Sequence, residues 1–186
     1  NDINKLEDTD LFFVCVSDDV IMEIINKINY LHTPIVHTSG CTDINVLNRF
    51  ISYGSFYPLQ SFQKDIEEEF NSIPIFLESN NDILRNNLLE IAYSLSDVVY
   101  EISSYQRKQL HLSAVFCSNF TNHLLSISET ILEKNDLDFN MLKPIIIRSI
   151  EKIKDNSPLD IQTGPAMRKD YAVIKSHIEM ILDDDI

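Results

Sequence analysis

The sequence predicts an α/β domain followed by an all-helical domain. From Leu11 to Ile102, short apolar runs of strand length alternate with stretches in which apolar residues recur at helical spacing. After Ser103 only the helical spacing remains. The alternation favours βαβ units and a mostly parallel sheet. We therefore place the domain boundary near residue 102, with domains over 1–102 and 103–186.

The strand signals lie in the first domain. Leu11–Val16 is a continuous apolar run, which is typical of a strand buried on both faces. Ser17 and the two aspartates after it offer helix-capping side chains. Pro74 favours the start of a strand or an edge strand, because proline donates no hydrogen bond to a sheet. We expect strands at 11–16, 34–37, 53–57, 73–78 and 98–102, and helices at 20–31, 46–51 and 82–95.

The second domain carries three predicted helices. Ser103 or Ser104 is expected to cap a long helix that runs to about Lys134. A second helix is predicted over 139–154, where Pro144 fits only in the first turn, and a third lies within 165–182. These helices hold more apolar positions than one buried face needs, which predicts a homodimer built from this domain. The positions are Leu124, Leu125, Ile131, Leu132 and the three consecutive isoleucines at 145–147.

Composition excludes several classes of protein. The net charge is −14 with only 15 basic residues and no basic cluster, so nucleic acid is not an expected partner. No apolar run reaches the ~18 residues of a membrane span, so no membrane association is expected either. Cys15, Cys41 and Cys117 have no metal-ligand spacing. We expect them to be buried, reduced thiols of a cytoplasmic protein without a bound metal.

The chain has three glycines, at positions 40, 54 and 164, where average usage of ~7% would give about thirteen. A chain so poor in glycine is expected to keep one where the backbone needs a positive φ or a close approach to another group. Gly40 and Gly54 adjoin short apolar runs, near which an α/β sheet presents its ligand-binding edge.

Four motifs occur in order along the chain: His37-Thr38-Ser39-Gly40, Gly54-Ser55-Phe56-Tyr57-Pro58-Leu59-Gln60-Ser61-Phe62, His111-x-x-Ala114-Val115-Phe116-x-Ser118-Asn119-Phe120 and Thr163-Gly164-Pro165. Together they resemble a family of bacterial Rossmann-like oxidoreductases, often labelled NADP or deazaflavin-coenzyme oxidoreductases. That family is similar to pyrroline-5-carboxylate reductase and to the 6-phosphogluconate dehydrogenase superfamily. The resemblance covers nearly the whole chain, from Leu11 to about Ile181. Members often carry His at the position of Tyr57.

The resemblance implies a fold and a cofactor. The first domain would be the C-terminal part of a Rossmann-like parallel sheet, and the second a 6-phosphogluconate-dehydrogenase-like helical domain. NADP or NAD would be the cofactor, and a small-molecule substrate would bind between the domains. The glycine-rich loop G-x-G-x-x-G is absent from this sequence. We therefore expect about 70 further residues before Asn1, with Leu11–Val16 as the fourth strand of the sheet.

The resemblance also selects candidate site residues. Those expected near the cofactor are Ser17, Asp18, His37, Ser39 and Gly40. Those expected to act in catalysis are His111, Ser118, Asn119 and Asn122, of which Ser118 and Asn122 fall within about 20° of His111 on a regular helix. His111 would deliver a proton to a developing alkoxide or amine, because imidazole titrates close to neutral pH. Substrate contacts are expected from Tyr57, Gln60, Thr163 and Arg168.

Structural interpretations stand beside the functional ones. Asp18 could be a helix N-cap, the segment after His37 could be a polar turn, and His111 could be a hydrogen-bonded structural histidine. Gly164 and Pro165 could simply punctuate the start of a helix. A dinucleotide-binding sensor or scaffold without turnover is the alternative to an oxidoreductase, and a fragment without independent activity is a third possibility.

Overall fold

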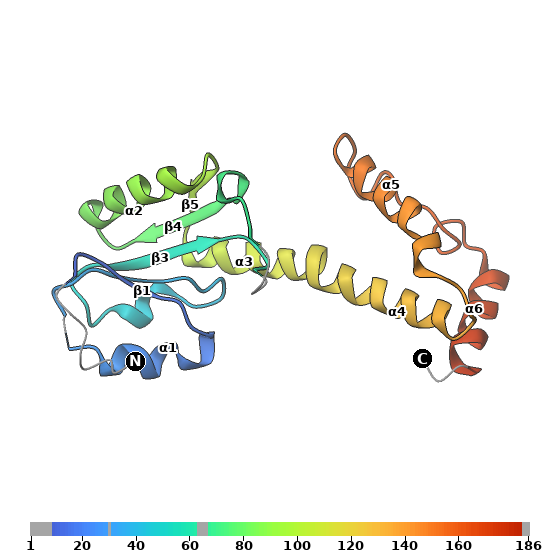
Figure 1. The fold of residues 1–186 in the computed structure, drawn as a ribbon, viewed down its shortest axis with the longest axis horizontal. Coiled ribbons are helices and arrows are strands. Elements are labelled where there is room, and N and C mark those ends of the chain that lie inside the picture. Colours follow the sequence, from blue (N-terminus) through green and yellow to red (C-terminus); the bar gives the residue numbers. More distant parts are fainter. Residues whose placement is uncertain (1–8, 30, 63–66, 184–186) are drawn as a thin grey trace. The chain divides into compact units, whose positions relative to one another are not determined.

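The structure is a computed structural model that describes residues 9–29, 31–62 and 67–183. The chain divides into two compact units, Asn1–Val115 and Phe116–Ile186 (Figure 1). The first unit thus extends beyond the predicted boundary at residue 102, because the helix after Ser103 packs on the sheet through Ser104 and Arg107, which are both buried.

The first unit is built on a five-stranded sheet in the order β1-β2-β3-β4-β5. The strands β1 and β2 pair in parallel, as do β2 with β3 and β4 with β5. Only β3 and β4 run antiparallel. The sheet is mostly parallel, as predicted, and its strands are β1 (Phe12–Val14), β2 (Ile35–His37), β3 (Tyr53–Pro58), β4 (Ile75–Ser79) and β5 (Val99–Glu101).

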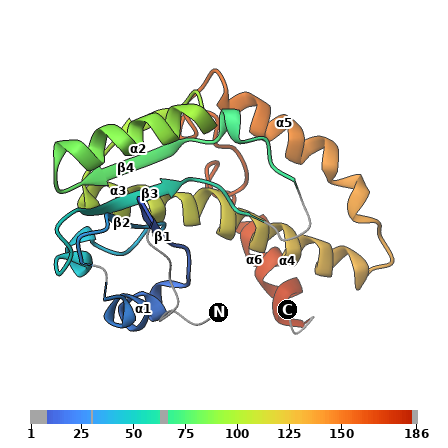
Figure 2. The ribbon, with the colours of Figure 1, turned by 60° about the vertical axis from the view of Figure 1, so that its left-hand side comes forward.

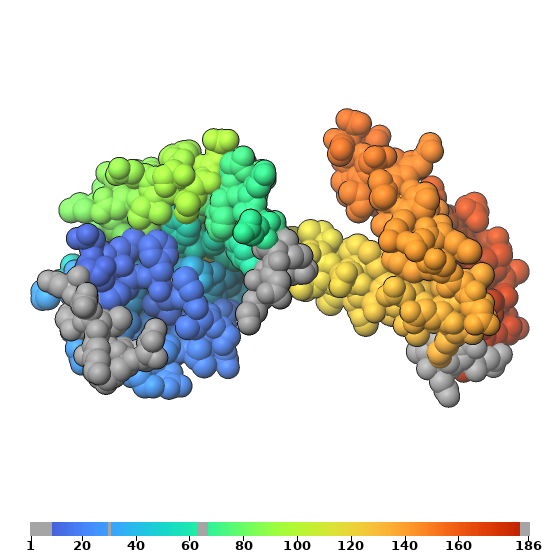
Figure 3. All heavy atoms as spheres, in the orientation of Figure 1, coloured from blue at the N-terminus to red at the C-terminus, as the bar shows by residue number. Residues whose placement is uncertain are grey.

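Helices cover the sheet on both faces (Figure 2). On one face α2 (Asp82–Leu95) buries Leu84, Leu88 and Ala92 against strand residues such as Val36 and Leu77. On the other face lie α1 (Ile21–Lys27) and η3 (Ile44–Leu47), whose apolar side chains pack on Val14 and Ile35. The short helix η2 (Asp18–Val20) directly precedes α1. Ile35 and Val36 enter different cores because successive side chains of a strand point to opposite faces. The space-filling view shows α2 and the segment around α1 as the two outer layers of this unit (Figure 3).

Two of the predictions for this unit are wrong. Phe13 of β1 is 42% exposed, so β1 is not buried on both faces. The helix α2, which covers this face of the sheet, packs mainly on β3, β4 and β5. The expectation of buried cysteines is also wrong: Cys15 and Cys41 of this unit are exposed, as is Cys117 of the second unit. Pro74 directly precedes β4, which agrees with the predicted position at a strand start.

Gly54 is explained by strand pairing. A Cβ at this position would lie 2.1 Å from the carbonyl oxygen of Glu78 in the neighbouring antiparallel strand. Any side chain would therefore push β3 and β4 apart. The prediction of a close approach is right, but the group approached is the backbone of β4.

A long helix begins in the first unit and continues into the second. Ser103 and Gln106 form a reciprocal capping box before α3 (Ser104–Ala114). A π-helix, η5 (Val115–Phe120), follows, and then α4 (Thr121–Glu133). The cap and the end of this helix agree with the prediction. The π-helix does not, and the regular 100° per residue used to align His111 with Ser118 and Asn122 does not hold through it.

The rest of the second unit is helical. It contains η6 (Phe139–Met141), α5 (Lys143–Ile153) and α6 (Tyr171–Asp183). The remaining described element of the first unit is η4 (Phe70–Ser72). The predicted helix start at Pro165 is wrong: Gly164 has φ +110°, Lys169 has φ 57°, and α6 begins only at Tyr171. No side chain from Phe116 to Leu182 is buried. Among the described helices, none combines the length and the apolarity needed to span a membrane.

Candidate functional site

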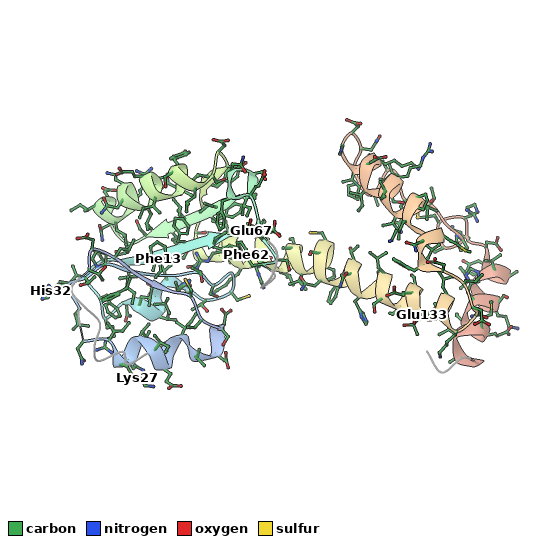
Figure 4. All side chains as sticks on the ribbon, viewed as in Figure 1. Phe13, Lys27, His32, Phe62, Glu67 and Glu133 are labelled. Atoms are coloured by element: carbon green, nitrogen blue, oxygen red, sulfur yellow. The ribbon has the colours of Figure 1, made fainter. Side chains whose placement is uncertain are left out.

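The carboxyl ends of β1, β2 and β3 meet at one edge of the sheet, because these three strands are parallel. Ser17 and Asp18 follow β1 as exposed residues, His37 closes β2, and Tyr57 is the last residue but one of β3. In Figure 4, His32, which precedes β2, lies at one end of the unit, and Phe62, which follows β3, lies at the opposite end. The predicted residues of this unit therefore share the edge where α/β proteins bind ligands.

His111, Tyr57 and Gly40 form the centre of this edge. The Tyr57 hydroxyl lies 3.0 Å from Nδ1 of His111, and the two ring planes meet at 65°. A Cβ on Gly40 would lie 2.6 Å from the same Nδ1 and 2.8 Å from Cγ. Gly40 is thus required because the imidazole packs on its backbone. Three motifs that are far apart in the sequence meet at this one ring.

Arg107 is the residue that the sequence analysis missed. Its side chain is fully buried, and its guanidinium group donates to the carbonyl oxygens of Ser39 (3.1 Å) and Thr42 (2.5 Å) and to Oε2 of Glu78 (2.5 Å). Ser104 donates to the same carboxylate over 2.6 Å. Arg107 precedes His111 by four residues, one turn of α3, so helical spacing from His111 could have found it.

Hydrogen bonds within the loop after β2 also stabilise that loop. The Ser39 hydroxyl oxygen accepts hydrogen bonds from the backbone N–H groups of Cys41 (3.1 Å) and Thr42 (2.8 Å), and it lies 2.9 Å from the Thr42 hydroxyl. This is the polar turn that the structural interpretation described. A contact between Ser39 and a cofactor stays a prediction.

His37 is a buried neutral imidazole. Its Nδ1 accepts a hydrogen bond from the Ser39 backbone N–H at 3.2 Å. Burial lowers the pKa of His37 to about 4, and the charge of Arg107 adds to the effect. At neutral pH His37 is therefore uncharged and fully buried, so it is not placed to act as a general acid, whereas His111 of the same edge is only half-buried.

The buried His37 predicts a pH-dependent stability. Below its ordinary pKa of ~6.5 the unfolded chain takes up a proton that the folded protein does not, so stability is lost as the pH falls towards 4. We expect the free energy of unfolding to fall by about 2 kcal/mol between pH 7 and pH 5. Urea titrations at both pH values measure it. In His37→Asn, which retains an acceptor for Ser39, this loss should largely disappear, and an equal loss in both proteins would assign it to other groups.

The remaining candidates of the first unit are Gln60, Ser17 and Asp18. The Gln60 amide donates to Glu68 at 3.2 Å, and its oxygen accepts from the Ser61 backbone N–H at 2.7 Å. Ser17 occupies the N-cap position of η2, yet its hydroxyl makes no capping hydrogen bond. Burial is the largest cause that raises the pKa of Tyr57, and the charge of Asp18 is a smaller one. Asp18 therefore lies within electrostatic reach of the Tyr57 hydroxyl.

The other five candidates belong to the second unit. Ser118 and Asn119 lie in η5, Asn122 lies in α4, and Thr163 and Arg168 lie in the turn before α6. All five side chains are exposed. Near Arg168, the start of α6 is bound by Asp170, whose Oδ1 accepts a hydrogen bond from the Val173 backbone N–H at 3.3 Å. Roles in catalysis and substrate binding for these residues stay predictions.

The first unit defines the class of protein: it is a Rossmann-like α/β unit with polar residues at the carboxyl edge of its parallel strands. The chain belongs to the family described as domain of unknown function DUF2520, which matches residues 73–186. A search of curated protein sequences finds no match.

Solved structures support the same fold. Protein BF3122 of Bacteroides fragilis, which carries the provisional name of an NADP oxidoreductase, is 36% identical with a TM-score of 0.88, over 99% of this chain and 73% of that one. Protein TM1727 of Thermotoga maritima is 26% identical with a TM-score of 0.73, over 93% and 70% of the two chains. Pyrroline carboxylate reductase of Plasmodium falciparum, solved with NADP bound, is 16% identical with a TM-score of 0.58, over 94% and 72%. At that identity the last match shows the fold alone.

Proposed function

We propose that this protein is an NADP- or NAD-dependent oxidoreductase that acts on a small molecule. The observation that carries the proposal is the His111–Tyr57 pair, 3.0 Å apart, at the carboxyl edge of a Rossmann-like sheet. The name of the Bacteroides fragilis relative supports the cofactor class. Binding of the substrate between the two domains, and the choice between the two nicotinamide cofactors, stay predictions.

The edge fits a nicotinamide cofactor in its chemistry. Ser17 and Asp18 are exposed after β1 and offer hydroxyl and carboxylate groups for a ribose. These residues would hold the cofactor, which supplies hydride chemistry when bound. The protein's own contribution would be a proton from His111, oriented by Tyr57 and by the loop that Arg107 holds.

Two measurements test this function. Titration of the full-length protein with NADPH, followed by nicotinamide fluorescence, is expected to show saturable binding. A screen of carbonyl and imine compounds is then expected to find one that consumes NADPH, seen as loss of its absorbance. Binding without turnover would favour the dinucleotide-binding sensor. The presence of Tyr57, where members of the family often have His, is the observation that supports this alternative. If the protein bound neither NADPH nor NADH, both the oxidoreductase and the sensor function would be contradicted.

We also propose that the second unit forms a homodimer. Leu124, Ile145 and Met180 are each more than 60% exposed, and no described side chain of this unit is buried. Apolar surface of this extent is rarely left in water. A second copy of the chain would cover the same surface on both partners, as in most symmetric dimers.

Light scattering is expected to give twice the mass of one chain at micromolar concentration. Ile145→Glu should shift the protein towards the monomer, since it places a charge on the proposed interface. Ile83→Glu is the matched control, because Ile83 is 77% exposed on α2 of the first unit and should leave the mass unchanged. A monomer in the unsubstituted protein would refute the dimer.

A further inference from the structure

The contacts of the His111 ring distinguish its two nitrogen atoms. Nδ1 faces the Tyr57 hydroxyl at 3.0 Å and the backbone of Gly40, where even a methyl group would lie at 2.6 Å. Tyr57 is only 9% exposed and Gly40 is buried. A substrate therefore has no space to reach Nδ1. Across residues 9–29, 31–62 and 67–183, no group is hydrogen-bonded to Nε2, and the His111 side chain is half-buried rather than enclosed.

Tyr57 can form a hydrogen bond with Nδ1 of His111 in both protonation states of the imidazole ring. Burial raises the pKa of Tyr57, so the phenol stays protonated at neutral pH and its O–H can donate to Nδ1 of a neutral imidazole. When the ring is an imidazolium, Nδ1 carries a proton and the phenol oxygen can accept it as a hydrogen bond. In both states Nε2 carries a proton and is not bonded to Tyr57. When the imidazolium gives up its Nε2 proton, the ring keeps the proton on Nδ1, whose hydrogen bond the phenol oxygen accepts.

We infer that Tyr57 is a positioning residue that fixes His111 with Nδ1 bound and Nε2 presented to the substrate. This inference rests on the proposed function for the role of the proton, but the tautomer it assigns is a property of the protein alone. Tyr57, which the family resemblance placed in contact with substrate, acts here through His111. The ring of Tyr57 is held by Phe76, 6.5 Å away between centroids, so its hydroxyl is presented from a packed side chain.

Histidine nitrogen NMR tests the inference without cofactor or substrate. The full-length protein, labelled with ¹⁵N-histidine and kept at alkaline pH, is expected to show Nδ1 of His111 unprotonated and Nε2 protonated. His111→Gln assigns the signals among the five histidines. In Tyr57→Phe, which keeps the ring and loses the hydroxyl, the shifts should move towards the tautomer mixture of a free imidazole. Tyr100→Phe is the control, since Tyr100 also stacks on Phe76, at 5.4 Å, and should leave the His111 shifts unchanged.

Each outcome decides between the alternatives. A proton on Nδ1 in the unsubstituted protein, or identical His111 shifts in Tyr57→Phe, would overturn the inference. Once a substrate is known, Tyr57→Phe should lower kcat about tenfold with NADPH affinity unchanged. Failure to bind NADPH would count against the proposed function and leave the tautomer result standing, so the two can fail separately.

Discussion

Replacing Arg107 by methionine is expected to lower the free energy of unfolding by about 3–5 kcal/mol. The guanidinium group is fully buried and pairs with Glu78, whose side chain is 18% exposed. Methionine fills part of the space but leaves that carboxylate without its counter-charge. It also leaves the carbonyl oxygens of Ser39 and Thr42 without the donors they have now. The measurement is a urea titration of both proteins at pH 7.

Arg85→Met is the matched control for this loss. Arg85 also forms an ion pair, with Glu101, but the two side chains are 45% and 42% exposed. Removing it should lower the free energy of unfolding far less than Arg107→Met does, since water solvates both charges once they are separated. In the double variant Arg107→Met/Glu78→Gln, part of the lost stability should return because no buried charge is left unpaired. Equal losses for Arg107→Met and Arg85→Met would contradict the account of the buried pair.

Replacing His111 by alanine is expected to lower kcat by ~10²-fold or more while NADPH affinity changes by less than about twofold. The reason is that His111 would deliver the proton but would not hold the dinucleotide. Steady-state kinetics with the substrate from the screen, together with NADPH titration, measure both quantities. The melting temperature of the variant is measured first, because loss of the imidazole also leaves the Tyr57 hydroxyl without its partner.

His123→Ala provides the comparison for His111. His123 is an exposed histidine of α4, and its removal should change neither the melting temperature nor kcat. Ser118→Ala and Asn122→Ala show whether the second unit contributes, and each should give a weaker loss of kcat than His111→Ala. If His111→Ala melts several degrees lower and retains its turnover, the histidine is structural.

The order of elements could be predicted from the sequence because it depends on local patterns. Apolar runs and helical spacing placed every strand and the helices α2, α3 and α4 within a few residues, and the cap at Ser103 agrees with its hydrogen bonds. The glycines were also informative: Gly40 and Gly54 mark close approaches and Gly164 a positive φ. The groups that approach Gly40 and Gly54 come from other elements of the fold, and a local sequence pattern does not predict which elements these are.

The arrangement of the site depends on contacts between residues far apart in the sequence, which local sequence patterns do not predict. Arg107 sits on a helix as an ordinary basic residue, and its burial arises only because loop carbonyls and Glu78 converge on it. The exposure of Phe13 follows from the position of α2, which packs mainly on β3, β4 and β5. The π-helix Val115–Phe120 contains no proline or glycine that would signal it. The predicted alignment of Ser118 and Asn122 with His111 therefore assumed a regularity that the helix does not have.

Titration of the full-length protein with NADP⁺, followed through the Cε1–H resonances of its histidines, tests the central claim most directly. His32 and His37 flank β2 at opposite ends, and His111 marks the carboxyl edge. If the dinucleotide binds at that edge, the resonance of His111 will shift with saturation while that of His32 stays in place. Saturable binding that shifts His32 and leaves His111 unmoved would contradict the account.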